Sequence, residues 1–308
     1  MYGYRQPQRN TGEIFRQIFF SKNVLSRLIL INTVIYLLVQ IVNLFAWLFA
    51  MRQEGEILSL IGRVLALPAS LPVLASKPWT LFTYMFLQEG FFHLLFNLIM
   101  LYFGGIIFLE YLNGKKLLWT YILGGLAGAF FFVAAYNIFP VFENVRSVAV
   151  ALGASASVLA IIIAIATYVP DYTIHLFLLG RMKMKYLALI FVAIDLLSIT
   201  KGNAGGHIAH LGGALWGFVY AFYLRKGNDF YKLFYNIHFT NPFTKRKWEK
   251  MDTTRPKTGR PMDDDEYSKR KIATQKEIDH ILDKISKSGY DSLTKAEKDL
   301  LFKNSSKE

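Results

Sequence analysis

The sequence predicts an all-α polytopic membrane protein, with a bundle of six transmembrane helices and a small helical tail in the cytoplasm. Three observations predict this fold class. Of the 308 residues, 53% are hydrophobic and only 19% are charged, which is too apolar for two soluble domains. Several long stretches contain no charged residue. The net charge of +13 comes from basic residues that gather beside these stretches.

Six apolar stretches are long enough to cross a bilayer, which takes about 20 residues of helix. The stretch at about 184–200 carries Asp195 in its interior, and an acid is tolerated there when it faces protein. The first stretch lacks a cleavage pattern and is interpreted as a retained anchor. The five stretches without a charged residue are 28–51, 90–109, 117–142, 147–170 and 202–224.

The positions of Lys and Arg predict which loops face the cytoplasm. Basic residues are dense before the first span, between the second and third, and before the fifth, whereas the loops on the other side hold few. Because six is an even number, both termini are expected in the cytoplasm. This distribution favours membrane lipids over nucleic acid as the partner of the positive charge. The residues on the inner side are Arg5, Arg9, Arg16, Lys22, Arg27, Lys115, Lys116, Arg181, Lys183 and Lys185.

The chain is predicted to have four parts. They are a cytoplasmic N-terminal segment at 1–27, a transmembrane core at 28–225, a basic and partly disordered linker at 226–273, and a helical pair at 274–304. Capping-box spacing at Thr274 and Glu277, and again at Thr294 and Glu297, predicts where the two terminal helices begin.

One outer segment, 57–76, is apolar but cannot cross the membrane as a straight helix. Arg63, Pro68 and Pro72 interrupt it, and proline breaks the hydrogen-bond ladder of a helix. The segment is therefore predicted to lie in the membrane interface.

Three polar side chains share one depth in this topology. The second, fourth and sixth spans enter from the outside, and at about 1.5 Å per residue Asn97, Ser155 and His210 lie roughly 10–12 Å below the outer boundary. His93 lies one turn above Asn97 on the same helical face. Ser155 and His210 could form a dyad, because a serine hydroxyl needs a base to take its proton. Candidate oxyanion donors are the backbone amide of Ser155, the Asn97 amide and the His93 ring.

Each of these residues also has a simpler interpretation. Serine and glycine are ordinary packing residues in membrane helices, and Ser157 is expected to pack. A single intramembrane histidine is more often packed or part of an ion path. Asp195 could orient a histidine, or it could be a satisfied contact between helices. Gly213 and Gly217 have the spacing that lets two membrane helices approach closely.

Four short motifs occur in a fixed order within residues 45–225. They are HLLFN at 93–97, GG at 104–105, GAS at 153–155, and AHLGG at 209–213 continuing to Gly217. Together they resemble the rhomboid family of intramembrane serine proteases. The resemblance implies a six-helix core with a membrane-embedded outer loop, cleavage of transmembrane segments of other proteins, and a Ser–His dyad without a third acid. No cofactor or metal is implied.

The resemblance also assigns roles to individual residues. It places the nucleophile on Ser155 and the base on His210, with His93 and Asn97 assisting the oxyanion. Gly153 belongs to the family's Gly-x-Ser-Gly motif and is grouped with Gly213 and Gly217 as a helix-packing residue at the site. Three positions depart from the family pattern without removing a reacting group: Ala156 replaces a glycine, Thr80 follows Trp79 in place of an arginine, and Leu159 replaces an aromatic residue.

Two alternative functions stay open at this stage. A non-proteolytic relative that binds transmembrane clients would keep the scaffold without needing Ser155 or His210. A small ion or proton-coupled transporter could use His93, Asp195 and His210 as its path, but that class predicts discontinuous spans in matching halves.

The expected surroundings follow from the favoured protease interpretation. The partners would be transmembrane protein substrates, membrane lipids and a cytoplasmic protein bound by the helical pair. The terminal pair resembles appendices on some bacterial rhomboids. The expected location is therefore a bacterial inner membrane, with the active site opening to the outer face.

Overall fold

The computed structural model describes residues 23–49, 60–176 and 180–231, together with short parts of the stretch from 277 to 301. The chain divides into two compact units, Met1–His238 and Phe239–Glu308. Residues 1–22 of the predicted N-terminal segment and most of the predicted linker lie outside the described residues, and residues 24–27 already belong to the first helix.

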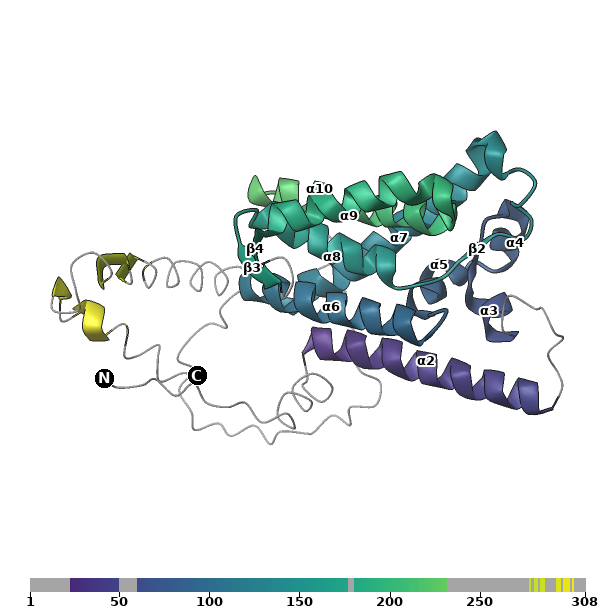
Figure 1. The fold of residues 1–308 in the computed structure, drawn as a ribbon, viewed down its shortest axis with the longest axis horizontal. Helices are drawn as coiled ribbons and strands as arrows, with labels where there is room; N and C mark the ends of the chain where they lie inside the picture. The colour runs from purple at the N-terminus through teal and green to yellow at the C-terminus, as the bar shows by residue number, and fades with distance from the viewer. Residues whose placement is uncertain are drawn as a thin grey trace, which may run out of the picture. The chain divides into compact units, whose positions relative to one another are not determined.

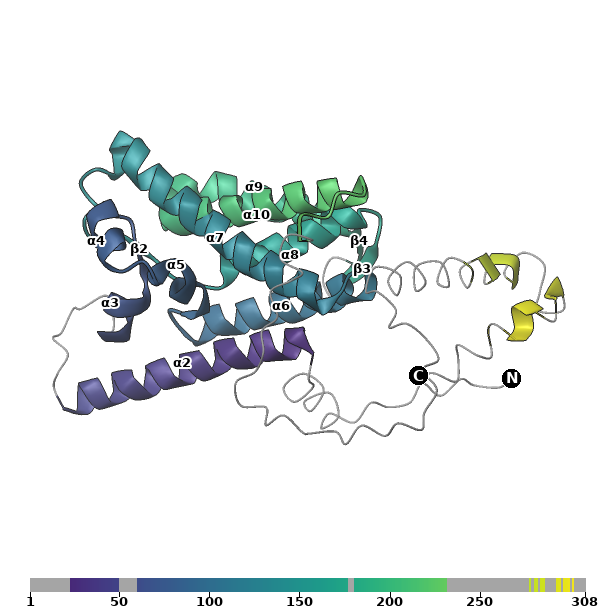
Figure 2. The same ribbon diagram turned by 180° about the vertical axis from the view of Figure 1, so that it is seen from behind.

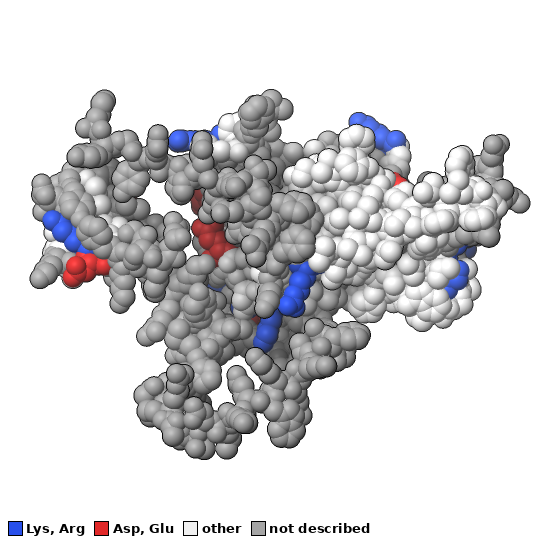
Figure 3. All heavy atoms as spheres, turned by 90° about the horizontal axis from the view of Figure 1, so that it is seen from below, with Lys and Arg blue, Asp and Glu red and all other residues white. Residues whose placement is uncertain are grey.

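Among the described residues of the first unit, three helices are long and apolar enough to cross a membrane: α2 (Val24–Leu48), α6 (Phe91–Tyr111) and α7 (Gly114–Ile138). The Asn23 side chain caps α2 by accepting a hydrogen bond from the Ser26 amide at 2.7 Å. The outer face of α2 exposes many large apolar side chains, and Figure 3 shows a broad surface without charge over the described helices. Such a surface suits contact with lipid. Three of the six predicted spans are supported in this way.

The remaining core helices are α8 (Ser155–Tyr168), α9 (Met184–Ser198) and α10 (Ala204–Arg225). Helix α8 packs against α6, α7, α9 and α10, and its residues from Ala156 to Ala166 are all buried. A helix that is apolar on every side is typical of such a central position. Figures 1 and 2 show α8 among its neighbours from opposite sides.

The prediction of a spanning helix over 147–170 is wrong at its start. Residues 147–154 are not helical, and they include the short strand β2 (Val150–Ala151). Absence of charge in the sequence cannot distinguish a buried extended segment from a helix. Helix α8 therefore begins at the residue predicted as nucleophile.

The predicted interface segment is broken into short elements, as its prolines require. Within 57–76 these are α3 (Leu60–Leu65), β1 (Leu67–Pro68) and α4 (Leu71–Ser76). Helix α5 (Thr80–Thr83) and the 3₁₀ turn η1 (Tyr84–Phe86) follow directly, and residues 60–86 are together called the outer segment from here on. Strand β1 pairs antiparallel with β2, and Asn137 of α7 donates to the Ala69 carbonyl at 2.8 Å. The Gly153 amide donates to the Tyr84 carbonyl at 3.0 Å. The outer segment is thus hydrogen-bonded to the strand that leads to Ser155.

The predicted close approach of helices occurs between α8 and α10. A Cβ atom at Gly213 would lie 2.1 Å from the Ala156 carbonyl oxygen, and one at Gly217 would lie 2.2 Å from that of Ala160. These separations are far below van der Waals contact. The two glycines therefore allow α10 to lie directly against the backbone of α8.

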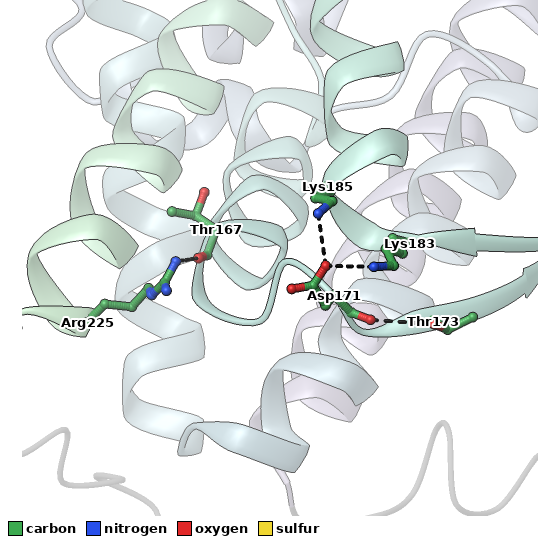
Figure 4. A network of polar contacts seen from close by, with 6 residues as sticks. All are labelled: Thr167, Asp171, Thr173, Lys183, Lys185 and Arg225. Atoms are coloured by element: carbon green, nitrogen blue, oxygen red, sulfur yellow. Dashed lines mark hydrogen bonds and ion pairs between the residues drawn. The ribbon is translucent and has the colours of Figure 1, made fainter.

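A charged cluster lies beside the hairpin of β3 (Thr173–Leu176) and β4 (Gly180–Lys183). Asp171 forms ion pairs with Lys183 at 3.0 Å and with Lys185 at 2.9 Å, as Figure 4 shows. Hydrogen bonds from these two lysines hold the pKa of the Asp171 carboxyl at about 2. A depressed pKa stabilises the fold above the ordinary value of 3.8, and that contribution is lost as the pH falls toward 2.

Packing contacts of the first unit extend beyond Leu224 to residue 231, past the predicted end of the transmembrane core at residue 225. Asp229 forms a buried ion pair with Lys116 of α7 at 3.0 Å. The Tyr231 side chain is buried, and its hydroxyl lies 3.1 Å from that of Thr120. These contacts pack the first residues of the predicted linker against α7, because a buried aromatic ring and a buried charge both find their partners there.

The second unit contains one of the two predicted capping boxes. The Thr294 amide donates to the Glu297 carboxylate at 2.7 Å, and the Glu297 amide donates back to the Thr294 hydroxyl at 3.4 Å. Lys284 adds an ion pair to the same carboxylate at 2.9 Å. The other box depends on Thr274, which lies outside the described residues.

Candidate active site

Ser155 is the first residue of α8, and the loop before it sets its position. Gly153 has a φ of +133°, which side-chain-bearing residues rarely adopt, and a Cβ atom there would lie 3.0 Å from Cε1 of His93. Gly153 was predicted as a helix-packing residue, but it belongs to this turn. The first amides of α8 have no acceptor within the helix and carry the positive end of its dipole. An anion beside Ser155 would meet these donors.

His210 lies on α10, facing Ser155 across the glycine-lined contact between α8 and α10. Its Nε2 atom is 2.6 Å from Ser155 Oγ, which is hydrogen-bond distance. The sequence placed these two residues at one depth on separate helices. The structure brings them into direct contact.

Asp195 of α9 meets the other side of the same imidazole. Its Oδ1 atom is 2.9 Å from Nδ1 of His210 and 2.8 Å from Nδ1 of His207, one turn earlier on α10. The sequence left Asp195 open between orienting a histidine and a helix contact, and the structure gives it contacts with two histidines. The three ligand atoms lie within 4.8 Å of one another and are of types that bind zinc.

His93 of α6 lies against the turn at Gly153 and lines the same cavity as Ser155. Its Nδ1 atom accepts a hydrogen bond from the Glu89 amide at 3.3 Å. In the neutral ring this leaves the proton on Nε2, the atom that would be 3.3 Å from a Cβ at Gly153. The Nε2–H group of His93 therefore lies at the turn before Ser155 and can donate a hydrogen bond into the cavity that both residues line.

Asn97, one turn further along α6, is buried and does not line the cavity. It donates to the Gln88 side chain at 2.8 Å, and Gln88 in turn donates to Asn32 of α2 at 3.3 Å. Gln88 does line the cavity. Gln88 was not among the residues predicted from the sequence, where it is a polar residue two positions before the apolar stretch at 90–109.

A cavity of about 890 Å³ contains Ser155, His210 and His93 on its walls. Helix α2, the outer segment, β2 and α10 complete the lining. Other polar side chains on its walls include Gln40, Asn43, Gln88, Glu89 and Asn203. This size admits a short extended peptide, and the polar walls allow water to reach the serine.

Comparison with protein families shows which family the chain belongs to. Residues 75–227, about half of the chain, match the rhomboid domain. The chain belongs to the rhomboid family. It is an integral membrane protein, in keeping with its three long apolar helices. Rhomboids are usually intramembrane serine proteases, and inactive relatives exist. Residues 263–307 match DUF6576, a family of unknown function. No curated protein matches the chain.

Two of the departures from the rhomboid pattern have local compensation. The methyl group of Ala156 packs toward Gly128 of α7, where a Cβ atom would approach it to 2.7 Å, so a glycine on the neighbouring helix provides its space. Thr80, which replaces an arginine, is buried, and its hydroxyl donates to the Lys77 carbonyl at 2.7 Å. The preceding Trp79 donates to the Val64 carbonyl at 2.9 Å. The third, Leu159, is buried with Ile163.

Ser157 provides a control for the nucleophile assignment. Its hydroxyl is fully buried and has no hydrogen-bond partner among the described residues. We expect Ser157→Ala to retain the parent's cleavage rate, and thermal unfolding in detergent should show equal or higher stability, because an unpaired buried hydroxyl costs on the order of 1 kcal/mol or more. Loss of activity in folded Ser157→Ala protein would contradict the assignment of Ser155.

Proposed function

We propose that this protein is an intramembrane serine endopeptidase that cleaves transmembrane segments of other membrane proteins. The observation that carries the proposal is the 2.6 Å contact between Ser155 Oγ and His210 Nε2 on the wall of a polar cavity, within a rhomboid domain. A relative that only binds clients has no need of this contact.

The chemistry proceeds in two steps. His210 takes the proton of Ser155 as the oxygen bonds to the scissile carbonyl carbon, and the tetrahedral oxyanion is stabilised by the amides at the start of α8 and by His93. The protonated His210 then gives its proton to the leaving amine, and the C–N bond breaks. Water repeats the sequence on the acyl-enzyme, with His210 again as base, and releases Ser155 and the new carboxylate. Asn97 contributes indirectly, because its side chain donates a hydrogen bond that positions Gln88 on the cavity wall.

A serine-directed probe tests the nucleophile directly. Purified protein should react with a fluorophosphonate or an isocoumarin, and peptide mapping should find the adduct on Ser155. Denatured protein should not react, because the serine would have lost its base. Absence of labelling in folded protein, or an adduct on another serine, would refute the proposal.

The proposal includes a membrane orientation. We infer six spans formed by α2, α6, α7, α8, α9 and α10, both termini in the cytoplasm of a bacterial cell, and a site that opens to the outer face of the inner membrane. The two short helices α8 and α9 cross only with the help of the segments that flank them. Lys115 and the β3–β4 hairpin lie on the cytoplasmic side in this arrangement.

Cysteine labelling tests the orientation, because the chain has no cysteine of its own. We expect single cysteines at the exposed positions Ser147 and Lys201 to react with an impermeant thiol reagent in intact cells. Cysteines at Lys115 and Arg181 should react only after lysis. The opposite pattern would place the dyad in the cytoplasmic half of the membrane and exclude an outward-opening site.

A further inference from the structure

We propose that Asp195 completes a Ser–His–Asp triad, as a positioning residue that holds His210 with Nε2 toward Ser155. The inference rests on the proposed proteolytic function and deepens it. The rhomboid resemblance implied a dyad without a third acid, so this arrangement adds a residue to the predicted machinery.

The geometry of His210 carries the inference. Each ring nitrogen has its own partner: Nε2 lies 2.6 Å from Ser155 Oγ, and Nδ1 lies 2.9 Å from Asp195 Oδ1. The three side chains come from three helices, α8, α10 and α9. Asp195 meets the one ring nitrogen of His210 that does not contact Ser155, and a contact made only for helix packing would not require this match.

These contacts determine which nitrogen carries the proton. An ionised carboxylate only accepts hydrogen bonds, so Nδ1 of His210 must be the protonated nitrogen. The lone pair on Nε2 then accepts the hydroxyl proton of Ser155. When that proton transfers to Nε2, the ring becomes positive, and the adjacent carboxylate of Asp195 stabilises it while remaining ionised. Without Asp195, the ring can adopt the other tautomer, in which Nε2 cannot act as a base.

The environment of Asp195 keeps its carboxylate in place. The residue is 6% exposed, and a charge at such a position needs partners. His207 provides the second one, since its Nδ1 donates to the same oxygen at 2.8 Å. The rings of His207 and His210 are nearly perpendicular, with centroids 6.0 Å apart. Two donors converging on one oxygen restrict rotation of the carboxylate and therefore fix the orientation of His210.

The same cluster could instead be a metal site, and one observation favours the triad. A zinc ion on Nδ1 of His210 would have to displace the hydrogen bond to Asp195, because Zn–N and Zn–O bonds are about 2.0–2.2 Å long. The present distances of 2.8 and 2.9 Å between nitrogen and oxygen are those of direct hydrogen bonds. A metal site would instead make cleavage depend on a bound metal ion, which the test below measures.

The test uses full-length protein in liposomes and a single-span substrate, with kcat and KM measured separately. We expect Asp195→Asn to lower kcat on the order of 100-fold or more with KM within about twofold of the parent, since the substitution removes charge and tautomer control without touching substrate. Asp195→Glu should recover part of kcat. His207→Gln, which leaves the contact between Asp195 and His210 intact, is the matched control and should lose less than about tenfold.

A second measurement does not depend on any variant folding. Nitrogen-15 NMR of histidine-labelled parent protein should show the Nδ1-protonated tautomer of His210. The Nε2-protonated tautomer would overturn the triad.

The remaining outcomes separate the triad from the protease assignment. Parent-like kcat in Asp195→Asn, alongside an inactive Ser155→Ala, would overturn the triad and leave the protease standing. Cleavage that is lost with a chelator and restored by zinc would replace the triad with a metal site. Unchanged cleavage with a chelator supports the triad. A parent protein without serine-dependent cleavage would overturn both proposals.

Discussion

Replacing Ser155 or His210 with alanine is expected to reduce peptide cleavage on the order of 10⁴-fold or more while the protein stays folded. Each substitution removes one atom of the 2.6 Å contact on which the nucleophile depends. The double variant should be no slower than either single variant, because the two side chains act as one unit. The measurement is the initial rate of cleavage of a single-span substrate, with thermal unfolding as the check on folding.

The comparison with Ser157→Ala makes this result specific. Both serines lie in the first turn of α8, and both substitutions remove one hydroxyl, but only Ser155 contacts His210. Substantial turnover by Ser155→Ala would exclude the proposed mechanism. Additive losses in the double variant would show that the two residues act in separate steps.

The substitution Gly213→Ala is expected to abolish most of the proposed peptide cleavage, although Gly213 does not itself take part in the proposed reaction. The Cβ atom of Gly213→Ala would lie 2.1 Å from the Ala156 carbonyl oxygen, and a backbone atom within a helix cannot move aside cheaply. Overpacking of this kind costs about 1–3 kcal/mol. Moving α10 away from α8 also separates His210 from Ser155, and a displacement of about 1 Å can cost on the order of 10²-fold in rate.

Gly90→Ala is the matched control for this substitution. Gly90 lies directly before α6 with a φ of −160°, and a Cβ atom there would have no neighbour within 4 Å. Its unfolding temperature and cleavage rate should stay close to those of the parent. Equal behaviour of Gly213→Ala and Gly90→Ala would contradict the role of close helix packing in aligning the dyad.

The parts of the site that could be predicted depend on position along a helix. Depth below the membrane boundary follows from counting residues, so Ser155 and His210 could be matched across two helices. The spacing of Gly213 and Gly217 likewise predicted the close approach of α10 to its neighbour.

The parts that escaped prediction depend on rotation and on loop conformation. Nearly every residue of α9 is apolar, so hydrophobic periodicity does not say which way Asp195 faces. Gly153 has a positive φ, and the non-helical chain before α8 is hydrogen-bonded to residues of the outer segment that are distant in sequence, so local sequence patterns could not predict either feature. Gln88 could not be predicted for the same reason, because the residues that hydrogen-bond its side chain, Asn97 and Asn32, are 9 and 56 positions away from it in sequence.

The pairing of β1 with β2 has a mechanical consequence for access to the serine. Main-chain hydrogen bonds join the outer segment to the chain just before α8, including Ala69 to Ala149 at 3.0 Å and Gly153 to Tyr84 at 3.0 Å. A hinged cover could swing away without disturbing what lies beneath it. This segment cannot, because lifting it would pull on the backbone that orients Ser155 and break several buried bonds, each costing about 1–3 kcal/mol when left unpaired. The outer segment is therefore a fixed support of the turn before Ser155, and under the proposed function a substrate helix would have to arrive beside this segment rather than displace it.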